Sequence, residues 1–494
     1  MGREEQIIEE RIKKIDELRC DGVDPYSHRF SLHEKRSWSI DIKEKYAKLK
    51  EEELGSEEIV AGRVMTKRSF GKLSFVKLQD VKGFIQLVFQ DKETPKDVLE
   101  VLKKIDAGDI IGVKGKALKT RTGEVSVLVK KLEVLTKSIL PLPEKFHGIK
   151  DEEEKLRKRY LDIIMNEEVK EIFIKKQKFW ATIRNFLIDH GFLEVETPIL
   201  EAAAGGAAAT PFATHHNALD MDVYLRISMG ELWQKKLLVA GYEKTFEIGR
   251  QFRNEGMDAE HLQDYSQMEF YWAYADFSDG MKLVEELYKK IAKNVLGSLK
   301  FERGEHKIDF GKDWVRYDFE DLIKKKTGVK IYEATKEEIM KKLKELNMEF
   351  DPKVDKWRMI DLLWKYCRKQ ISGPGFLVGQ PVELTPLAKR SEKDPRKVEQ
   401  FQVILAGSEV GNGYSELNDP IDQEERFKRQ RELGESGDSE AMEHDESFVE
   451  ALKYGMPPAC GFGFSERLFS FLMNRPIREC VIFPLMKPEG EKGE

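Results

Sequence analysis

Cysteine is scarce in this chain of 494 residues, and its four cysteines lie far apart. Cys20, Cys367, Cys460 and Cys480 form no C-x-x-C pair, which argues against a zinc site and a disulfide framework and fits a reducing compartment. The chain also lacks an apolar run long enough to span a membrane. Its first residues are charged and do not resemble a signal peptide. We therefore expect a soluble, cytoplasmic protein with no membrane partner.

A strong excess of charge of one sign is also absent. The sequence has 84 basic and 90 acidic residues, so its net charge is −6. Bulk charge therefore gives no argument for a nucleic-acid partner, and any such site must be a local patch. The length is sufficient for two or more domains, each with its own core.

The stretch from 246 to 274 predicts two β-strands around a polar loop, because apolar and polar residues alternate on both sides of it. Arg253, Glu255, Glu269 and Tyr271 belong to this stretch. Charges on a half-buried sheet are costly unless a charged ligand offsets them. A surface hairpin whose charges face water is the simpler alternative, but it explains the clustering poorly.

Residues 59–140 have a period of two and predict five short strands with glycine-containing turns. Five strands in this order suggest a small barrel of the OB type, which often binds single-stranded nucleic acid. The alternation places Arg68, Phe75 and Gln86 on the outer face. An aromatic ring, an amide and a guanidinium are suited to reading an unpaired base. Alternatively, Phe75 covers a helix packed on the barrel.

The second half of the chain carries further acidic and glycine-rich segments. Glu231 opens a predicted helix, where a glutamate is normally a partner of the helix dipole. Residues 409–416 place carboxylates and an aromatic at strand-like spacing. Gly461 and Gly463 precede a helix that carries Arg467 in its first turn. Their spacing does not match a dinucleotide-binding fingerprint, but it fits a flat strand against a planar ligand.

Several segments together resemble the bacterial-type lysyl-tRNA synthetases of class II, over nearly the full length. The resemblance rests on the order and joint presence of PLPEKFHG, GGAAA-PF-THHNALD, FRNEG followed by M-E-x-Y, GNGYSELND and the arginine at 467. A long helix at 169–190 and the segment FLEVETPIL, predicted to be a strand, are similar to motif 1 of that class, which builds a dimer interface.

The resemblance implies an α+β protein with a five-stranded OB-type barrel and a catalytic domain made of an antiparallel sheet flanked by helices. The expected division is a helical segment at 1–55, an anticodon-binding barrel at 56–142, a linker at 143–165 and the catalytic domain at 166–494. We expect an accessory helical lobe at about 280–375.

The implied activity is ligation of lysine to the 3′ end of tRNA(Lys) through lysyl-adenylate, with ATP as substrate and Mg²⁺ as cofactor. The catalytic residues would be Arg253 and Arg467. The expected ATP site comprises Arg253, Glu255, His261, Tyr265, Glu409 and Arg467. The expected lysine site comprises Gly206, Glu231, Glu269, Tyr271, Asn412, Tyr414 and Glu416.

The same resemblance implies that Arg68, Phe75 and Gln86 read the anticodon and that the chain forms a homodimer through the motif 1 helix and strand. Glu409 would bind magnesium. Gln402 stands where the family usually has a second glutamate, so the number of magnesium ions is open. Glu260 replaces a residue that is typically basic.

Three other interpretations compete. A paralogue that lysylates a protein would generally lack the barrel. A synthetase for aspartate or asparagine would share the architecture, but the set Glu231, Glu269 and Glu416 suits a cationic side chain. A non-catalytic RNA-binding homologue is opposed by the retention of Arg253 and Arg467.

Overall fold

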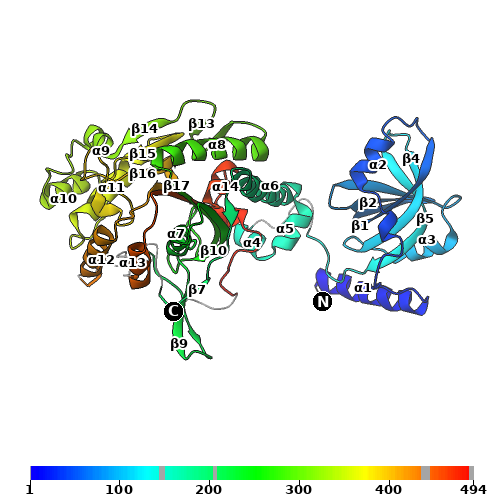
Figure 1. Ribbon diagram of the computed structural model, residues 1–494. Coiled ribbons are helices and arrows are strands. Elements are labelled where there is room, and N and C mark those ends of the chain that lie inside the picture. Colours follow the sequence, from blue (N-terminus) through cyan, green and yellow to red (C-terminus); the bar gives the residue numbers. More distant parts are fainter. Residues whose placement is uncertain (1, 144–150, 204–208, 436–444, 489–494) are drawn as a thin grey trace. The chain divides into compact units, whose positions relative to one another are not determined.

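The computed structural model describes residues 2–143, 151–203, 209–435 and 445–488. The chain divides into two compact units, Met1–Asp151 and Glu152–Glu494. Both are shown in Figure 1, and each is considered by itself.

The first unit contains a closed five-stranded barrel with strand order β1-β2-β3-β5-β4. Its strands are β1 (Leu54–Phe70), β2 (Leu73–Gln79), β3 (Phe84–Gln90), β4 (Ile110–Lys119) and β5 (Val125–Thr136). Alternate residues such as Val76, Leu78, Ile85 and Leu87 are buried inside it, as the period of two predicts. The predicted barrel is confirmed.

Helices close the barrel core from outside. They are α1 (Arg3–Cys20), α2 (Ser39–Lys45) and α3 (Lys96–Lys103). Leu18 of α1, Ile42 of α2 and Leu102 of α3 join the same buried cluster as the barrel strands. The N-terminal helical segment therefore packs on the barrel.

An eight-stranded sheet forms the second unit, in the order β14-β15-β16-β17-β18-β11-β10-β6. Neighbouring strands are antiparallel except at the two edges, where β14 pairs with β15 and β10 with β6 in parallel. The strands are β6 (Leu193–Glu194), β10 (Lys244–Phe252), β11 (Asp264–Ala273), β14 (Val315–Asp318), β15 (Gly375–Val378), β16 (Gln400–Leu405), β17 (Ser408–Ser415) and β18 (Ala459–Ser465). This α+β arrangement confirms the expected fold class.

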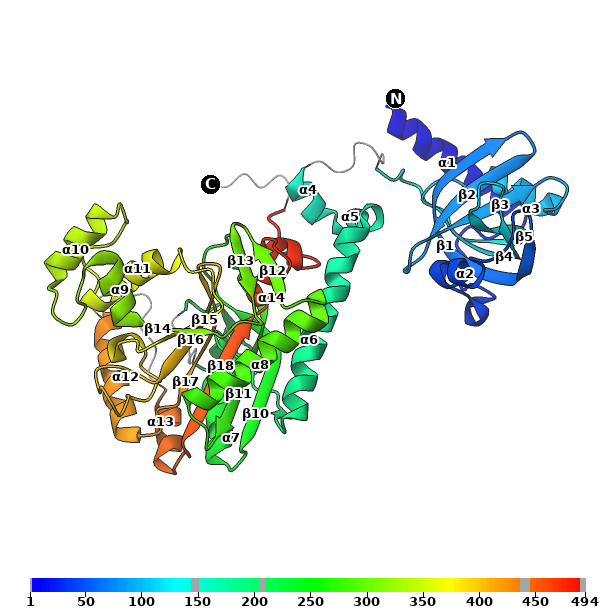
Figure 2. The same ribbon diagram turned by 90° about the horizontal axis from the view of Figure 1, so that it is seen from above.

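Helices cover both faces of this sheet. The helices α6 (Glu167–Asp189), α8 (Phe277–Leu296) and α14 (Arg467–Leu472) pack on one face through a cluster that includes Met268, Phe270 and Phe462. Figure 2 shows α6 and α8 beside the sheet. The opposite face is covered by α7 (Glu231–Val239), α12 (Pro420–Glu435) and α13 (Glu446–Lys453). Two short helices, α4 (Glu152–Arg157) and α5 (Arg159–Met165), precede α6.

A smaller helical lobe has its own core. It comprises α9 (Phe319–Thr327), α10 (Lys336–Glu345) and α11 (Lys356–Arg368). We expected the lobe to start near residue 280, and this was wrong for α8. Nine residues on the apolar stripe of α8 are buried, most of them in the main sheet cluster, so this helix belongs to the body of the domain.

The segment 192–200 was expected to form one strand, and this was wrong. Only β6 and β7 (Leu200–Glu201) are extended, and they belong to different sheets. Between them, the backbone N–H and hydroxyl of Thr197 donate to Glu247 Oε2, at 3.2 and 2.7 Å. Pro198 has no N–H to give to a ladder. A side-chain acceptor therefore replaces the strand partner.

Two small sheets complete the unit. One contains β7, β8 (Ala213–His216) and β9 (Met221–Leu225), and the other contains β12 (Lys300–Arg303) and β13 (His306–Asp309). Within the part of the chain that the structure describes, no helix has both the length and the apolar composition needed to span a bilayer.

Candidate active site

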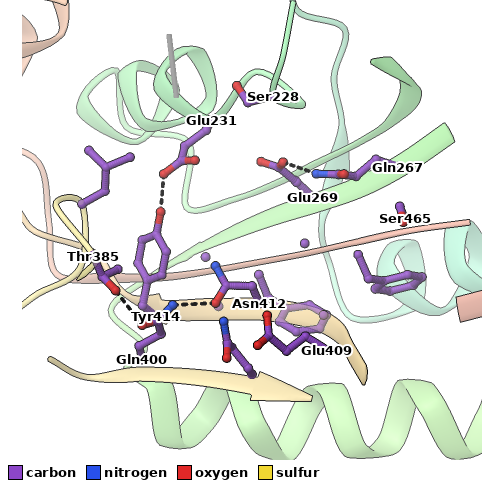
Figure 3. Close-up of a pocket in the computed structure, with 18 of the residues that line it drawn as sticks. Ser228, Glu231, Gln267, Glu269, Thr385, Gln400, Glu409, Asn412, Tyr414 and Ser465 are labelled. Carbon is purple, nitrogen blue, oxygen red and sulfur yellow. Dashed lines mark hydrogen bonds between the residues drawn. The ribbon is translucent and has the colours of Figure 1, made fainter. Parts of the chain in front are cut away.

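A cavity of about 490 Å³ lies over the sheet face opposite α6 and α8. Strand alternation explains this placement. On β11, Gln267, Glu269 and Tyr271 line the cavity, whereas Met268 and Phe270 are buried in the core on the other face. Figure 3 shows Glu231 of α7 pointing towards Tyr414 of β17.

Two glycines of β18 keep this cavity open. Gly461 lies between Tyr271 of β11 and Tyr414 of β17, and Gly463 lies beside Glu269. A Cβ at Gly461 would come within 2.2 Å of Glu416 Oε1, and one at Gly463 within 2.6 Å of Glu269 Cγ. Glycine is therefore required for the side chains of both neighbouring strands to meet above β18.

One end of the cavity, which we call the acidic end, is formed by Glu231, Glu269, Tyr271, Tyr414 and Glu416. All five are buried. Glu231 Oε1 accepts a hydrogen bond from the Tyr414 hydroxyl, and Glu269 Oε2 accepts one from the Tyr271 hydroxyl at 3.0 Å. Glu269 Oε1 also accepts from Gln267 Nε2 at 2.5 Å. The carboxylates are thus fixed before any ligand arrives.

Burial makes the negative charges at the acidic end unfavourable. It raises the pKa of Glu269 and of Glu416, and neighbouring carboxylates raise both further. The pKa values of Tyr271 and Tyr414 are raised well above their usual range by burial and the same charges, so both hydroxyls stay protonated as donors. A cation is the ligand that this end of the cavity favours.

The other end, which we call the arginine end, contains Arg253, Glu260, His261 and Arg467. Arg253 Nε donates to the Ile227 carbonyl at 3.2 Å. Arg467 is the first residue of α14; its Nη1 lies 3.3 Å from His261 Nε2 and its Nε 3.2 Å from Glu260 Oε2. Burial lowers the pKa of Arg467, which the nearby carboxylates oppose. Two guanidinium groups in one cavity suit a polyphosphate.

Glu409 enters the same cavity from β17 and is held by the helical lobe. Its Oε1 accepts from Trp364 Nε1 at 2.6 Å and lies 2.7 Å from Arg368 Nη1. Gln402 of β16 lines the cavity nearby. Within residues 2–143, 151–203, 209–435 and 445–488, no three acidic, histidine or cysteine side chains are close enough to hold a metal by themselves.

The remaining expected residues also lie in the cavity. Glu255 and Tyr265 line it near His261. The Tyr265 hydroxyl accepts from Gln251 Nε2 at 2.5 Å, and burial raises its pKa. Asn412 Oδ1 accepts from Gln400 Nε2 at 2.7 Å (Figure 3).

The barrel carries a second candidate surface in the other unit. The register pairs Arg68 with Phe75, and it places Gln86 on the same face, two residues along β3 from Val88, the partner of Phe75. The Phe75 ring meets Phe70 edge-on at 6.4 Å, and Phe70 is 65% exposed. A pair of adjacent aromatic rings is suited to stacking on unpaired bases.

Comparison with known proteins agrees with this geometry. Residues 151–487 match the family described as tRNA synthetases class II (D, K and N), and residues 59–135 match the OB-fold nucleic acid binding domain. The chain belongs to the class II tRNA synthetases. Its barrel is an OB fold, and its cavity lies on the antiparallel sheet of the synthetase domain.

Individual relatives match along almost their whole length. The chain is similar to proteins named lysine–tRNA ligase from Thermosipho africanus, Thermotoga maritima and Bacillus subtilis. The first is 44% identical, with 97% of this chain and 96% of the relative covered. The second is 43% identical, with 98% and 97% covered, and the third is 43% identical, with 97% of each covered.

The structure brings almost all of the residues expected at the site into one cavity. Gly206 lies outside the described residues. Sequence reasoning missed four ion pairs: Lys235 with Glu231 and with Glu416, Glu260 with Arg467, and Arg368 with Glu409. The only sequence signal for the Lys235 contacts is the i, i+4 spacing of Glu231 and Lys235. Glutamate and lysine have this spacing on many exposed helices, so it does not indicate a buried ion pair.

Proposed function

We propose that this class II synthetase is a lysine–tRNA ligase. The observation that carries the proposal is one cavity with three buried carboxylates at the acidic end and two arginines at the other. An amino acid with two ammonium groups suits the acidic end, and a triphosphate suits the arginine end. The names of the relatives agree with this choice.

In the proposed first step, the lysine carboxylate attacks the α-phosphorus of ATP. The new P–O bond forms as the bond to pyrophosphate breaks, which gives lysyl-adenylate. No side chain of the protein becomes covalently attached, so positioning and charge neutralisation supply the rate. Arg253 would hold the attacking carboxylate and the α-phosphate, and Arg467 the γ-phosphate. Glu255, His261 and Tyr265 would frame the adenine.

The acidic end would select lysine. Glu416 and Tyr271 would receive the ε-ammonium, and Glu231 the α-ammonium, with Gly206 completing that subsite. Asn412, Tyr414 and Glu269 would form the walls. An aspartate side chain would meet like charges here, and the neutral amide of asparagine would leave a buried carboxylate without a cationic partner; both arguments disfavour these two amino acids as substrates.

Glu409 fits the role of a magnesium ligand. Mg²⁺ is commonly bound by one or two carboxylates together with substrate phosphates, and Glu409 offers one carboxylate beside the arginine end. Gln402 would add a neutral oxygen. Magnesium, when bound, would neutralise charge on the phosphates. Trp364 and Arg368 keep the Glu409 side chain in position for this role.

In the second step, a hydroxyl of the terminal adenosine of tRNA(Lys) would attack the lysyl carbonyl, and AMP would leave. We propose that the barrel binds the anticodon through Arg68, Phe75 and Gln86, and that the protein acts in the cytoplasm on this tRNA. We also propose a homodimer through α6 and the edge around β6, where Ile188 and Leu193 are exposed.

Exchange of labelled pyrophosphate into ATP, measured with a panel of twenty amino acids, tests the activation step. We expect exchange with lysine alone. Exchange with aspartate or asparagine, or with none of the panel, would contradict the proposal. Sedimentation equilibrium tests the assembly, and a particle of twice 57.3 kDa is expected.

Phe75→Ala tests the barrel. Loss of one stacked base is expected to weaken tRNA charging by about 10- to 100-fold, on the basis of roughly 1–3 kcal/mol per base. Pyrophosphate exchange should stay unchanged, because the two units have separate cores. Tyr26→Ala removes an exposed aromatic outside the barrel strands and is the matched control. Equal loss of both activities in Phe75→Ala would contradict the anticodon role.

A further inference from the structure

A charged lysine of the protein itself is buried within the acidic end. Lys235 lies in α7, one turn after Glu231, and its side chain is 1% exposed. Its Nζ is 2.7 Å from Glu231 Oε1 and 2.6 Å from Glu416 Oε2. The rings of Tyr271, Tyr414 and Phe448 surround the ammonium at 5.4–5.9 Å.

A buried ion pair is weak evidence for stability alone. Its desolvation cost often exceeds the attraction, and apolar replacements of similar size are frequently neutral or better. Here one lysine faces a set of three carboxylates, so it does not complete a neutral pair. Burial lowers the pKa of Lys235, but Glu231 and Glu416 outweigh this effect and the net shift is upward, so the side chain stays charged.

The charges at the acidic end can therefore be counted. With Glu231, Glu269 and Glu416 ionised, Lys235 leaves two negative charges uncompensated. The proposed substrate has two ammonium groups, and its carboxylate faces Arg253. The count matches only when Lys235 is included, because three free carboxylates would leave one buried charge without a partner.

The contacts agree with this count. Lys235 and the Tyr414 hydroxyl both use Oε1 of Glu231. On Glu416, Lys235 approaches Oε2, while Oε1 is buried and has no hydrogen-bond partner in the described part of the chain. That oxygen faces Gly461, beside the Tyr271 ring, where the ε-ammonium is proposed to bind.

We propose that Lys235 is a specificity-determining residue of the lysine site. It acts as an internal cation that neutralises one of three carboxylates and sets the acidic end to accept one dicationic amino acid. This inference rests on the proposed function. Lys235 does not touch the substrate; it acts through Glu231 and Glu416, so it is a positioning residue.

Recovery of activity in a double variant tests the charge count. Glu416→Gln alone leaves one uncompensated negative charge, and it should raise the lysine KM in pyrophosphate exchange by at least about a hundredfold. Adding Lys235→Met restores two negative charges. We expect the double variant to have a lysine KM about tenfold lower than Glu416→Gln alone, since couplings between contacting residues reach a few kcal/mol. A purely structural lysine predicts equal or greater loss.

Lys236→Met is the matched control in the same background. Lys236 follows Lys235 in α7, but its Nζ donates to Ser447 Oγ at 2.8 Å outside the cavity. Combined with Glu416→Gln, it should leave the raised lysine KM unchanged. The KM for ATP should be the same in all variants, because the arginine end is intact.

If the methionine double variant does not fold, Lys235→Gln combined with Glu416→Gln replaces it, because glutamine is also neutral and the charge count is the same. A lysine KM no lower than that of Glu416→Gln would overturn the inference. So would loss of folded protein in both double variants while Glu416→Gln folds, because Lys235 would then be structural. Absence of lysine-dependent exchange in the unaltered protein would instead overturn the proposed function.

Discussion

The acidic end and the arginine end of the cavity hold their charges differently. Glu416 is 1% exposed and pairs with a lysine that is equally buried. At the arginine end, Glu260 is 30% and Arg467 15% exposed, and both residues of this ion pair line the cavity. Glu255 and His261 are exposed there.

The proposed ligands account for this difference in exposure. A small cation gains most from carboxylates that are already desolvated and fixed, since no rearrangement then accompanies binding. In the proposed function, a triphosphate brings its own charge and would replace Glu260 as the partner of Arg467. The acidic end would then be preorganised, whereas the arginine end would exchange partners. The following predictions test this contrast, from the largest expected effect to the smallest.

Glu416→Gln should affect lysine far more than ATP. Removing one partner of a buried charged set costs about 3–5 kcal/mol, which corresponds to a fall of about 150- to 5,000-fold in kcat/KM for lysine. Pyrophosphate exchange at varied lysine and varied ATP measures both. Glu450→Gln on the exposed side of α13 is the control. An unaltered lysine KM would show that Glu416 does not hold the substrate.

Arg467→Ala should have the reverse selectivity. Loss of one preorganised cation at the phosphates is expected to lower kcat/KM for ATP by about a hundredfold, given about 2.7–4 kcal/mol for a lost charge-stabilising donor. The lysine KM should change little. Arg475→Ala removes an arginine that pairs with Glu479 at 2.8 Å outside the cavity and serves as control. A similar fall in kcat/KM for lysine and for ATP would contradict the difference between the two ends.

The lysine KM should fall as pH rises, while the ATP KM should not follow. The ligand-free protein raises the pKa of Glu269 to about 7 and that of Glu416 to about 8. Below these values the carboxyl groups are protonated, and a bound ammonium needs the ionised forms. One pH unit below such a pKa leaves roughly a tenth ionised, so the lysine KM should change by up to about tenfold per unit. A flat lysine profile from pH 6 to about 9 would contradict the raised pKa values.

Glu260→Gln should improve ATP binding slightly. It removes the carboxylate that occupies Arg467, and a partly exposed pair is worth about 0.2–1 kcal/mol, so the ATP KM should fall by about two- to fivefold. Asp264→Asn, which removes the exposed partner of Arg250 in the same hairpin, is the control. A higher ATP KM would mean that Glu260 takes part in holding the nucleotide.

The local sequence pattern was sufficient to predict much of the fold and of the candidate site. The alternation in β11 assigned Glu269 and Tyr271 to one face and Met268 to the other, and the structure agrees. The barrel followed in the same way, including the shared face of Arg68 and Phe75. The prediction of one strand at 192–200 was wrong because the backbone N–H of Thr197 donates to the side chain of Glu247 and not to a neighbouring strand's backbone, a contact that local pattern does not reveal.

The sequence by itself determined which side chains share a face of each strand, because a period of two is a local property of the chain. It also determined the family, since the order of motifs is linear. Only the tertiary structure decided that Lys235 meets Glu416 and that Arg368 meets Glu409. Such contacts depend on the order of the strands in the sheet and on which helix covers which face. The whole core determines both features, because the stabilising free energy is distributed over many long-range contacts.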